Sequence, residues 1–233
     1  MTPELGKIYH GDCLEIMKSW PDGFVDLVVT DPPYGVDYQT SWRSDNDPLV
    51  KKIANDSGNW LPFAEAWLNE VARILKPDTH LYAFGSFLTA PQMQPLIASK
   101  LTFKNTLVWD KMNWSVGDLE GDYGRQYELI YFAHKGRKLL GGGKRLGNLL
   151  RASRGSGADY EHPTQKPEEI IAKLIEQSSS EQDVVCDPFL GSGTTAIVAE
   201  KMNRRWVGCE IEPQYIDVAQ KRLDAERAQL RMF

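Results

Sequence analysis

Residues 184–210, VVCDPFLGSGTTAIVAEKMNRRWVGCE, contain the pattern that decides the fold. A short apolar run ends at Asp187, and a turn with Gly191 and Gly193 follows. An apolar stretch typical of a helix comes next, and a second β-rich run ends at Glu210. Glycines permit a tight turn and a close approach of the backbone to a ligand. The segment therefore predicts a strand, a glycine turn, a helix and a second strand of an open α/β sheet.

The glycine turn also predicts a ligand. Gly191, Gly193 and Ala196 fit G-x-G-x-x-G/A in the strand–turn–helix context that a nucleotide-binding fingerprint requires. Glu210 follows Asp187 by 23 positions, where a carboxylate can accept hydrogen bonds from ribose hydroxyls. The negative charge of Asp187 suits a ligand with an amino group or a sulfonium better than a pyrophosphate. The competing interpretation is an ordinary tight turn beside a surface acid.

The rest of the chain repeats the alternation of strands and helices. Further β-rich runs are expected at 24–30, 80–84, 101–109 and 126–133. Helices with one apolar face are expected around 63–75, 170–175 and 216–230, with Pro167 in the first turn of the second one. We therefore expect one α/β domain over residues 1–233, with a Rossmann-like, mostly parallel, twisted sheet and helices on both faces.

Composition excludes several other classes of protein. The 233 residues are 42% hydrophobic and 25% charged, as in ordinary globular domains. A mean hydropathy of -0.42 and the lack of a long apolar run argue against a membrane span. The first residues show no secretory signal, so we expect a cytoplasmic protein. Three scattered cysteines predict neither a disulfide framework nor a metal site.

One segment departs from the overall net charge of -5. Residues 135–158 hold seven basic side chains and no acidic one. The seven are Lys135, Arg137, Lys138, Lys144, Arg145, Arg151 and Arg154. A basic, glycine-rich segment on an acidic body is typical either of a loop that contacts phosphates or of a solvated linker.

The tetrad Asp31-Pro32-Pro33-Tyr34 follows the apolar run 24–30. It should lie at the carboxyl end of a strand, where open α/β sheets bind their ligands. The prolines fix the backbone and leave carbonyl oxygens unused by the sheet. A carboxylate, a carbonyl and an aromatic ring in one rigid frame offer two acceptors for an exocyclic amino group and a surface on which a base can stack. A rigid turn with a packed tyrosine is the alternative.

Three motifs together carry a resemblance to a known family. The tetrad at 31–34, HPTQKP at 162–167 and DPFLGSGTT at 187–195 resemble the S-adenosylmethionine (AdoMet)-dependent DNA amino-methyltransferases. The tetrad comes first and the glycine turn last, which resembles the β class, whose motif order is permuted. The resemblance covers nearly the whole chain and implies base flipping, because the amino group is inaccessible inside a duplex.

The resemblance also implies roles for individual residues. Asp31 and the Pro32 carbonyl, held by Pro33, would bind the target amino group, and Tyr34 would stack on the flipped base. The expected cofactor pocket comprises Asp12, Cys13, Thr164, Lys166, Asp187, Phe189, Gly191, Ser192, Gly193, Thr194 and Glu210. In that pocket Asp12 would face the adenine, Glu210 the ribose, and Thr164 and Lys166 the methionine carboxylate. The basic residues would contact DNA from a short target-recognition segment at about 135–160.

The acceptor base follows from the first residue of the tetrad. In this family aspartate there is more often associated with adenine N6, and serine is common for cytosine N4. We therefore expect site-specific methylation of adenine N6 in double-stranded DNA, with N4-cytosine methylation as the alternative. A homodimer and a cognate restriction endonuclease are the further partners compatible with the resemblance.

Rival classes of function are less compatible with these motifs. A nicotinamide-dependent oxidoreductase would explain the glycine turn, but its fingerprint usually opens the fold and would leave Asp31-Pro-Pro-Tyr34 without a role. A DNA-binding module without catalysis is disfavoured because the acidic, aromatic and glycine positions are all intact. An RNA or a protein amide is a third alternative for the acceptor.

Overall fold

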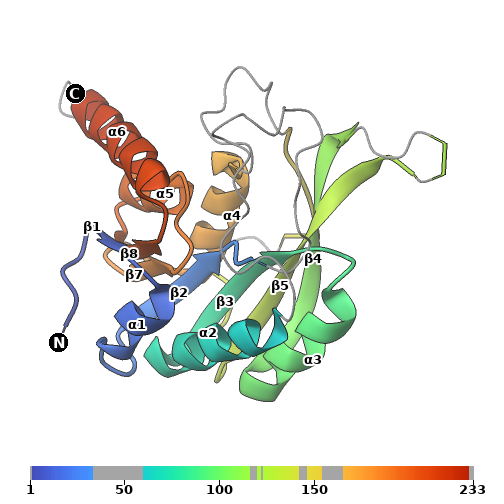
Figure 1. Cartoon of the computed structure of the whole chain (residues 1–233), viewed down its shortest axis with the longest axis horizontal. Helices are drawn as coiled ribbons and strands as arrows, with labels where there is room; N and C mark the ends of the chain where they lie inside the picture. Colours follow the sequence, from blue (N-terminus) through green and yellow to red (C-terminus); the bar gives the residue numbers. More distant parts are fainter. Residues whose placement is uncertain are drawn as a thin grey trace.

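The computed structural model describes residues 2–33, 60–115, 120–121, 123–141, 146–153 and 165–230. Within these ranges one sheet of eight strands has the order β1-β8-β7-β2-β3-β5-β4-β6 (Figure 1). The strands are β1 (Lys7–His10), β2 (Val25–Thr30), β3 (Leu75–Gly85), β4 (Thr102–Ser115), β5 (Arg125–Lys135), β6 (Leu149–Arg151), β7 (Val184–Asp187) and β8 (Arg205–Glu210). β5 is antiparallel to β3 and to β4, and the other neighbouring strands pair in parallel.

Helices cover both faces of the sheet and form two apolar cores (Figure 1). One core holds α1 (Cys13–Lys18), α2 (Leu61–Ile74) and α3 (Ala90–Lys100). The other holds α4 (Glu168–Ser178), α5 (Thr194–Lys201) and α6 (Pro213–Leu230). The Rossmann-like, mostly parallel sheet with helices on both faces is thus confirmed.

The central strand β2 shows how the sequence builds both cores at once. Val28 packs into the core with α1, α2 and α3, while Leu27 and Val29 pack into the core with α4, α5 and α6. All three side chains are fully buried. A strand buried on both faces reads as a continuous apolar run rather than an alternating one, which is the pattern that predicted it.

Some elements depart from the sequence-based expectation. Leu75 does not continue the helix before it but begins β3, so the strand includes Lys76 and Pro77 and is longer than predicted. The helices α1 and α3 and the strand β6 were not expected from the sequence. The six residues of α1 are too few for a periodic pattern, and α3 carries Pro95 inside it, a residue that usually signals a helix end.

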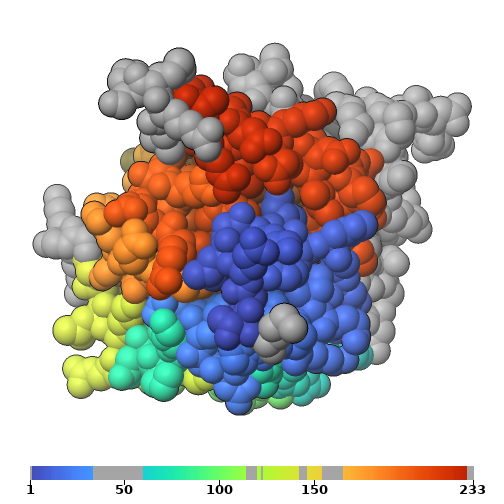
Figure 2. Space-filling model, turned by 90° about the vertical axis from the view of Figure 1, so that its left-hand side faces the viewer, coloured from blue at the N-terminus to red at the C-terminus, as the bar shows by residue number. Residues whose placement is uncertain are grey.

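The first and last strands of the chain pair at one side of the sheet. β1 pairs in parallel with β8, and Figure 2 shows the first residues, in blue, packed against the last elements, in red. β7 lies between β8 and β2, so the glycine turn after β7 comes next to the segment after β2. The two motifs furthest apart in sequence are therefore neighbours at the carboxyl ends of the parallel strands.

Two further observations concern the class of protein. In the ranges described above, no helix combines the length and apolarity that crossing a membrane requires. Cys13, Cys186 and Cys209 are free and buried. Burial raises the pKa of the Cys13 thiol to about 12, so this thiol is protonated and a poor nucleophile at neutral pH.

Candidate active site

The segment after β2 brings Asp31 beside the glycine turn. Thr30, the last residue of β2, donates a hydrogen bond from its Oγ1 to Oδ1 of Asp187 on β7, at 2.7 Å. Asp31, Pro32 and Pro33 follow directly, and the Asp31 side chain is 24% exposed. The structure thus brings Asp31 and Asp187 to one edge of the sheet. Tyr34, the predicted stacking residue, lies outside the described residues.

Asp187 is a buried carboxylate held by three donors. Besides Thr30, the Thr195 Oγ1 donates to Oδ2 at 2.8 Å and the Phe189 backbone N donates to Oδ1 at 3.1 Å. Burial raises the pKa of Asp187 to about 6, although these three hydrogen bonds act to lower it. Nearby Asp31 adds to the increase because two like charges repel. The site therefore concentrates negative charge where a cationic ligand would compensate it.

The glycine turn has the backbone conformation that its sequence predicts. Gly191 and Gly193 have φ of +54° and +81°, in the left-handed region that favours glycine. Gly193 precedes α5 and packs against α6, where an added Cβ would lie 2.9 Å from the Cβ of Ala219. Arg222 of α6 donates to the Ser192 carbonyl at 2.6 Å and to Thr194 Oγ1 at 3.2 Å. The turn is therefore fixed from behind by α6.

Glu210 ends β8 and faces the same turn. Its Oε2 accepts from the Gly191 backbone N at 2.7 Å, and its Oε1 accepts from the backbone N of Ile211 and Glu212, each at 2.9 Å. Burial raises the pKa of Glu210, and the three amides partly oppose this increase. An α-carbon substituent on Gly191 would meet nothing within 4 Å, so the structure leaves room next to this carboxylate.

Asp12 and Cys13 come shortly after the neighbouring strand β1, whose last residue, His10, pairs with Glu210. The backbone N of Gly11, which follows β1, donates to the Glu210 carbonyl at 3.0 Å. Asp12 caps α1 by accepting a hydrogen bond from the Leu14 backbone N at 2.8 Å. Cys13 is 5% exposed and belongs to the apolar core. The structure thus places Asp12 at the carboxyl edge and Cys13 beneath it.

Phe189 and Lys166 complete the described part of the predicted pocket. Phe189 packs edge-on against Phe63 and Trp67 of α2, with ring centroids 6.0 and 5.8 Å away. The Lys166 ammonium lies 2.5 Å from Oδ2 of Asp31. In this structure the lysine expected at the methionine carboxylate thus forms an ion pair with the catalytic candidate Asp31. Thr164 lies outside the described residues.

Two charged residues that extend the ion pair of Asp31 and Lys166, Glu128 and Lys111, were not expected from the sequence. Glu128 on β5 lies 3.2 Å from the Lys166 ammonium through Oε2, and 2.7 Å from the Lys111 ammonium of β4 through Oε1. The available signal was a charge within the otherwise apolar strand 126–133. Such a charge is costly in a sheet covered on both faces unless it is paired.

The predicted DNA-contacting residues divide between the two ends of the parallel strands, which we call the carboxyl edge and the amino edge of the sheet. Lys135 lies opposite Thr79 near the start of β3, and its ammonium donates to the carbonyls of Ala72 and Leu75, each at 2.6 Å. The neighbouring Arg137 and Lys138 contact Asp78 and Asp183, which also lie toward the amino ends of parallel strands. These three basic residues are thus at the edge opposite Asp31.

Arg151 lies at the other edge. It ends β6, whose parallel pairing with β4 puts it toward the carboxyl ends of the parallel strands. Its side chain is 67% exposed and lies 3.4 Å from Asp110. Lys144, Arg145 and Arg154 lie outside the described residues.

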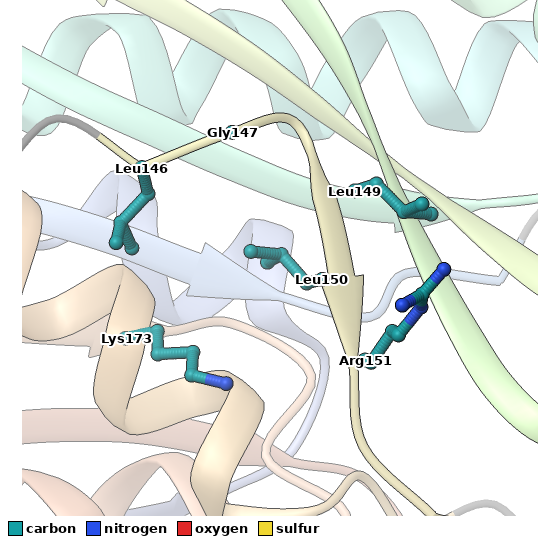
Figure 3. Close-up of a pocket in the computed structure, with 6 residues that line it drawn as sticks. All are labelled: Leu146, Gly147, Leu149, Leu150, Arg151 and Lys173. Carbon is teal, nitrogen blue, oxygen red and sulfur yellow. The ribbon is translucent and has the colours of Figure 1, made fainter.

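A shallow hollow of about 360 Å³ lies beside β6, separate from the residues around Asp31. It is lined by Leu146, Gly147, Leu149, Leu150, Arg151 and Lys173 (Figure 3). Figure 3 shows Lys173 on a helix turn across from the strand that carries Arg151. Lys173 pairs with Glu169 one turn away on α4, at 2.6 Å. None of the acidic residues discussed above lines this hollow.

The carboxyl edge of the sheet has the donors and acceptors that a nucleoside-type cofactor with a cationic tail requires. The carboxylates of Asp187 and Glu210 flank a glycine turn whose Gly191 leaves space for close approach. Such acceptors suit ribose hydroxyls and an ammonium or sulfonium group. Together with Asp31 at the adjacent strand end, they form a cluster of three carboxylates at the carboxyl ends of neighbouring parallel strands, where open α/β enzymes bind their ligands.

Comparison with known proteins identifies the family. The model of the N6/N4 methyltransferase family, described as DNA methylase, matches residues 25–145 and 140–221. Type II methyltransferase M.HinfI of Haemophilus influenzae is 32% identical over 94% of this chain and 68% of its own length. The M1.HpyAVI–SAM complex shares 26% identity and a TM-score of 0.72, over 93% of this chain and 98% of that one. The PvuII cytosine-N4-specific DNA methyltransferase, at 20% identity, supports the fold with a TM-score of 0.74 over 94% of this chain and 86% of that one.

The chain belongs to the N6/N4 family of DNA methyltransferases. Its cofactor is AdoMet, the group present in the complex with M1.HpyAVI. The family resemblance predicted from the three sequence motifs is thereby confirmed, as are the AdoMet cofactor and the fold.

The two glycines of the turn provide a matched pair of substitutions. Gly191→Ala adds a side chain in open space and should cost only the left-handed backbone, about 1–2 kcal/mol of the free energy of unfolding. Gly193→Ala adds the same strain plus a contact with Ala219 and should cost more. Urea unfolding of both variants measures the difference. Equal losses would contradict the packing of Gly193 on α6.

The raised pKa of Asp187 predicts a pH-dependent stability. The folded protein favours protonated Asp187. The contribution of this residue to the free energy of unfolding is therefore fully present below its ordinary pKa of 3.8 and is lost as the pH rises through about 6. Asp187→Asn cannot ionise, so the variant does not lose this stability as the pH rises. Relative to wild type, the variant should gain up to about 3 kcal/mol between pH 4 and pH 8, in unfolding measured without cofactor. A pH-independent difference would show that Asp187 titrates normally.

Proposed function

We propose that this chain transfers a methyl group from AdoMet to the exocyclic N6 of adenine in double-stranded DNA. The observation that carries the proposal is the position of Asp31-Pro32, at the end of β2 and directly beside Asp187 and the glycine turn. The choice of adenine rests on aspartate as the first residue of the tetrad, the form more often associated with N6 in this family. N4-cytosine methylation is the alternative.

Asp31 and Pro32 would act on the nucleophile. The lone pair of an exocyclic amino group is delocalised into the ring, which makes the nitrogen a poor nucleophile. Hydrogen bonds from its two N–H groups to the Asp31 carboxylate and the Pro32 carbonyl would localise the lone pair and fix its direction. A carboxylate has about four lone-pair sites, so Asp31 can accept from Lys166 and from a base.

The residues around the amino group would also stabilise the charge that develops there. The sulfonium cofactor supplies an activated methyl group. As the nitrogen attacked the methyl carbon, the bond from that carbon to sulfur would break and S-adenosylhomocysteine would leave. The nitrogen would become cationic, and the fixed negative charge of Asp31 would lower the energy of that state. The nitrogen would then lose a proton to solvent and regain a neutral amino group. We propose that the Tyr34 ring adds a stacking surface for the base and a cation–π contact. Holding both reactants in line supplies much of the remaining acceleration.

The cofactor would lie across the ends of β7, β8 and β1. We propose that Glu210 binds the ribose, that Asp12 faces the adenine, and that Gly191 allows the backbone to approach. Asp187 would compensate the positive end of the cofactor. Cys13, Phe189, Ser192, Gly193 and Thr194 would shape the pocket from behind, since they are packed against core helices or tied to α6. Thr164 and Lys166 remain proposed for the methionine carboxylate.

DNA would approach the carboxyl edge of the sheet, because both reacting groups lie there. Of the described basic residues predicted to contact DNA, we retain Arg151 at this edge and leave out Lys135, Arg137 and Lys138 at the opposite one. Lys144, Arg145 and Arg154 stay in the proposal as members of the same segment at about 135–160. We propose a single catalytic domain over residues 1–233, with a homodimer and a restriction endonuclease as further partners.

Methyl transfer to unmethylated genomic DNA with labelled AdoMet, followed by nucleoside mass spectrometry, tests the proposal. N6-methyladenine is expected. Asp31→Ala should lower the rate by about 100-fold or more while AdoMet affinity stays within about threefold, because Asp31 acts on the acceptor base. N4-methylcytosine would overturn the base. Near wild-type turnover by Asp31→Ala would overturn the mechanism.

A second experiment tests the DNA-facing edge. Arg151→Ala should weaken binding to a DNA duplex and reduce the slope of log affinity against log salt by about 1, because one phosphate contact is lost. Arg137→Ala removes the same charge at the opposite edge and is the matched control, for which no change is expected. Fluorescence anisotropy across a salt series measures both. Equal effects of the two substitutions would contradict the assignment of the DNA-binding edge.

A further inference from the structure

Four alternating charges run from β4 to the catalytic candidate Asp31. The Lys111 ammonium lies 2.7 Å from Glu128, Glu128 lies 3.2 Å from the Lys166 ammonium, and Lys166 lies 2.5 Å from Asp31. The four residues come from β4, from β5, from the segment before α4 and from the end of β2. The Lys166 ammonium also lies 5.1 Å from the centre of the Phe84 ring on β3. Residues distant in sequence thus converge on one buried lysine.

Lys166 poses an electrostatic problem for the proposed reaction. Asp31 is expected to stabilise positive charge on the attacking nitrogen, yet it carries an ammonium group on Oδ2. A single ion pair has no net charge, so Lys166 alone would cancel much of the potential that Asp31 provides. Glu128 is a second carboxylate on the same ammonium, so Asp31, Lys166 and Glu128 together carry a net charge of -1, and Lys111, at the far end of the row, brings the four charges to zero. Lys111 contacts the other oxygen of Glu128 rather than Lys166.

The environment keeps these groups charged. Burial would lower the pKa of Lys166, whose side chain is 9% exposed, but Asp31 and Glu128 together raise it above its ordinary value. Burial would also raise the pKa of Glu128, yet Lys166 and Lys111 bring it below its ordinary range. Each carboxylate therefore contributes to holding the Lys166 proton at neutral pH.

We propose that Glu128 is a positioning residue that acts on Asp31 through Lys166. It holds the ammonium from the side away from β2 and offsets its charge, so that Asp31 stays oriented and keeps a negative potential toward the acceptor nitrogen. The inference rests on the proposed function, since it assigns Asp31 to the acceptor. A purely structural role for Glu128, tying β5 to β4 through Lys111, is the alternative to be distinguished.

Glu128→Gln preserves the size of the side chain and removes its charge. At saturating AdoMet and DNA, kcat should fall by about tenfold or more while the KM for AdoMet stays within about threefold, because the charge acts on the transition state. Glu65→Gln is the matched control. It removes one carboxylate from the Lys100 pair of α2 and α3, and its kcat should equal that of wild type. A wild-type kcat for Glu128→Gln would overturn the inference.

A double variant separates the electrostatic role from a structural one. In Glu128→Gln the Lys166 charge is offset by Asp31 alone, so adding Lys166→Met should raise kcat above that of Glu128→Gln, measured at AdoMet concentrations that saturate the double variant because Lys166 is also proposed for the methionine carboxylate. If Glu128 only stabilised the fold, the second substitution would lower kcat further, and that result would refute the inference. Should Glu128→Gln not fold, Glu128→Asp keeps the charge but withdraws it by one methylene. The kcat of Glu128→Asp should lie below that of wild type, and a wild-type kcat would also refute the inference.

A titration keeps the inference independent of activity. NMR of the Lys166 side chain, assigned with Lys166→Arg, reports its proton loss in wild type and in Glu128→Gln. Deprotonation at lower pH is expected in the variant, because burial is then opposed by one carboxylate instead of two. Identical titrations of Lys166 in wild type and in Glu128→Gln would refute the inference, whether or not the wild-type chain methylates DNA. A wild-type chain that methylates no DNA would refute the proposed function, and the titration would still test the role of Glu128.

Discussion

The hydrogen bond between Thr30 and Asp187 is the interaction on which the site depends. It joins the last residues of β2 and β7, which are 157 positions apart in sequence, across a distance of 2.7 Å. Parallel pairing of these strands fixes their carboxyl ends at the same height, so the Asp31 segment and the glycine turn leave the sheet side by side. Any acceptor held by Asp31 and any cofactor held by the turn are then neighbours.

The same arrangement is costly because it buries negative charge. Each of the three carboxylates has a different set of hydrogen-bond donors. Asp187 receives two hydroxyl groups and an amide, Glu210 receives three backbone amides, and Asp31 receives a lysine. Neutral donors leave the charge of Asp187 and Glu210 in place, and burial raises the pKa of both. A cationic partner on Asp31 requires a further carboxylate, and β5 supplies it as Glu128.

Local pattern predicted most of the fold and the ends of the key strands. The apolar run before Asp31 and the glycine turn after Asp187 are contiguous in sequence, so their geometry follows from short-range rules about strands and turns. The contacts of Lys166 could not be predicted in this way. Its partners Asp31 and Glu128 lie 135 and 38 positions away in the numbering, and only the strand order brings them together.

The direction of one strand, β5, explains both why Glu128 was not predicted for the site and why the basic segment is divided. A β-rich run in sequence carries no mark of its direction within a sheet. Because β5 is antiparallel, its first half, with Glu128, points back toward the carboxyl ends of β2 and β3, where Gly85 pairs with Leu129. Its last residue, Lys135, then reaches the amino ends, and the basic residues that follow begin at the edge away from the site. Had β5 been parallel, Lys135 would lie beside Asp31, and Glu128 would be out of reach of Lys166.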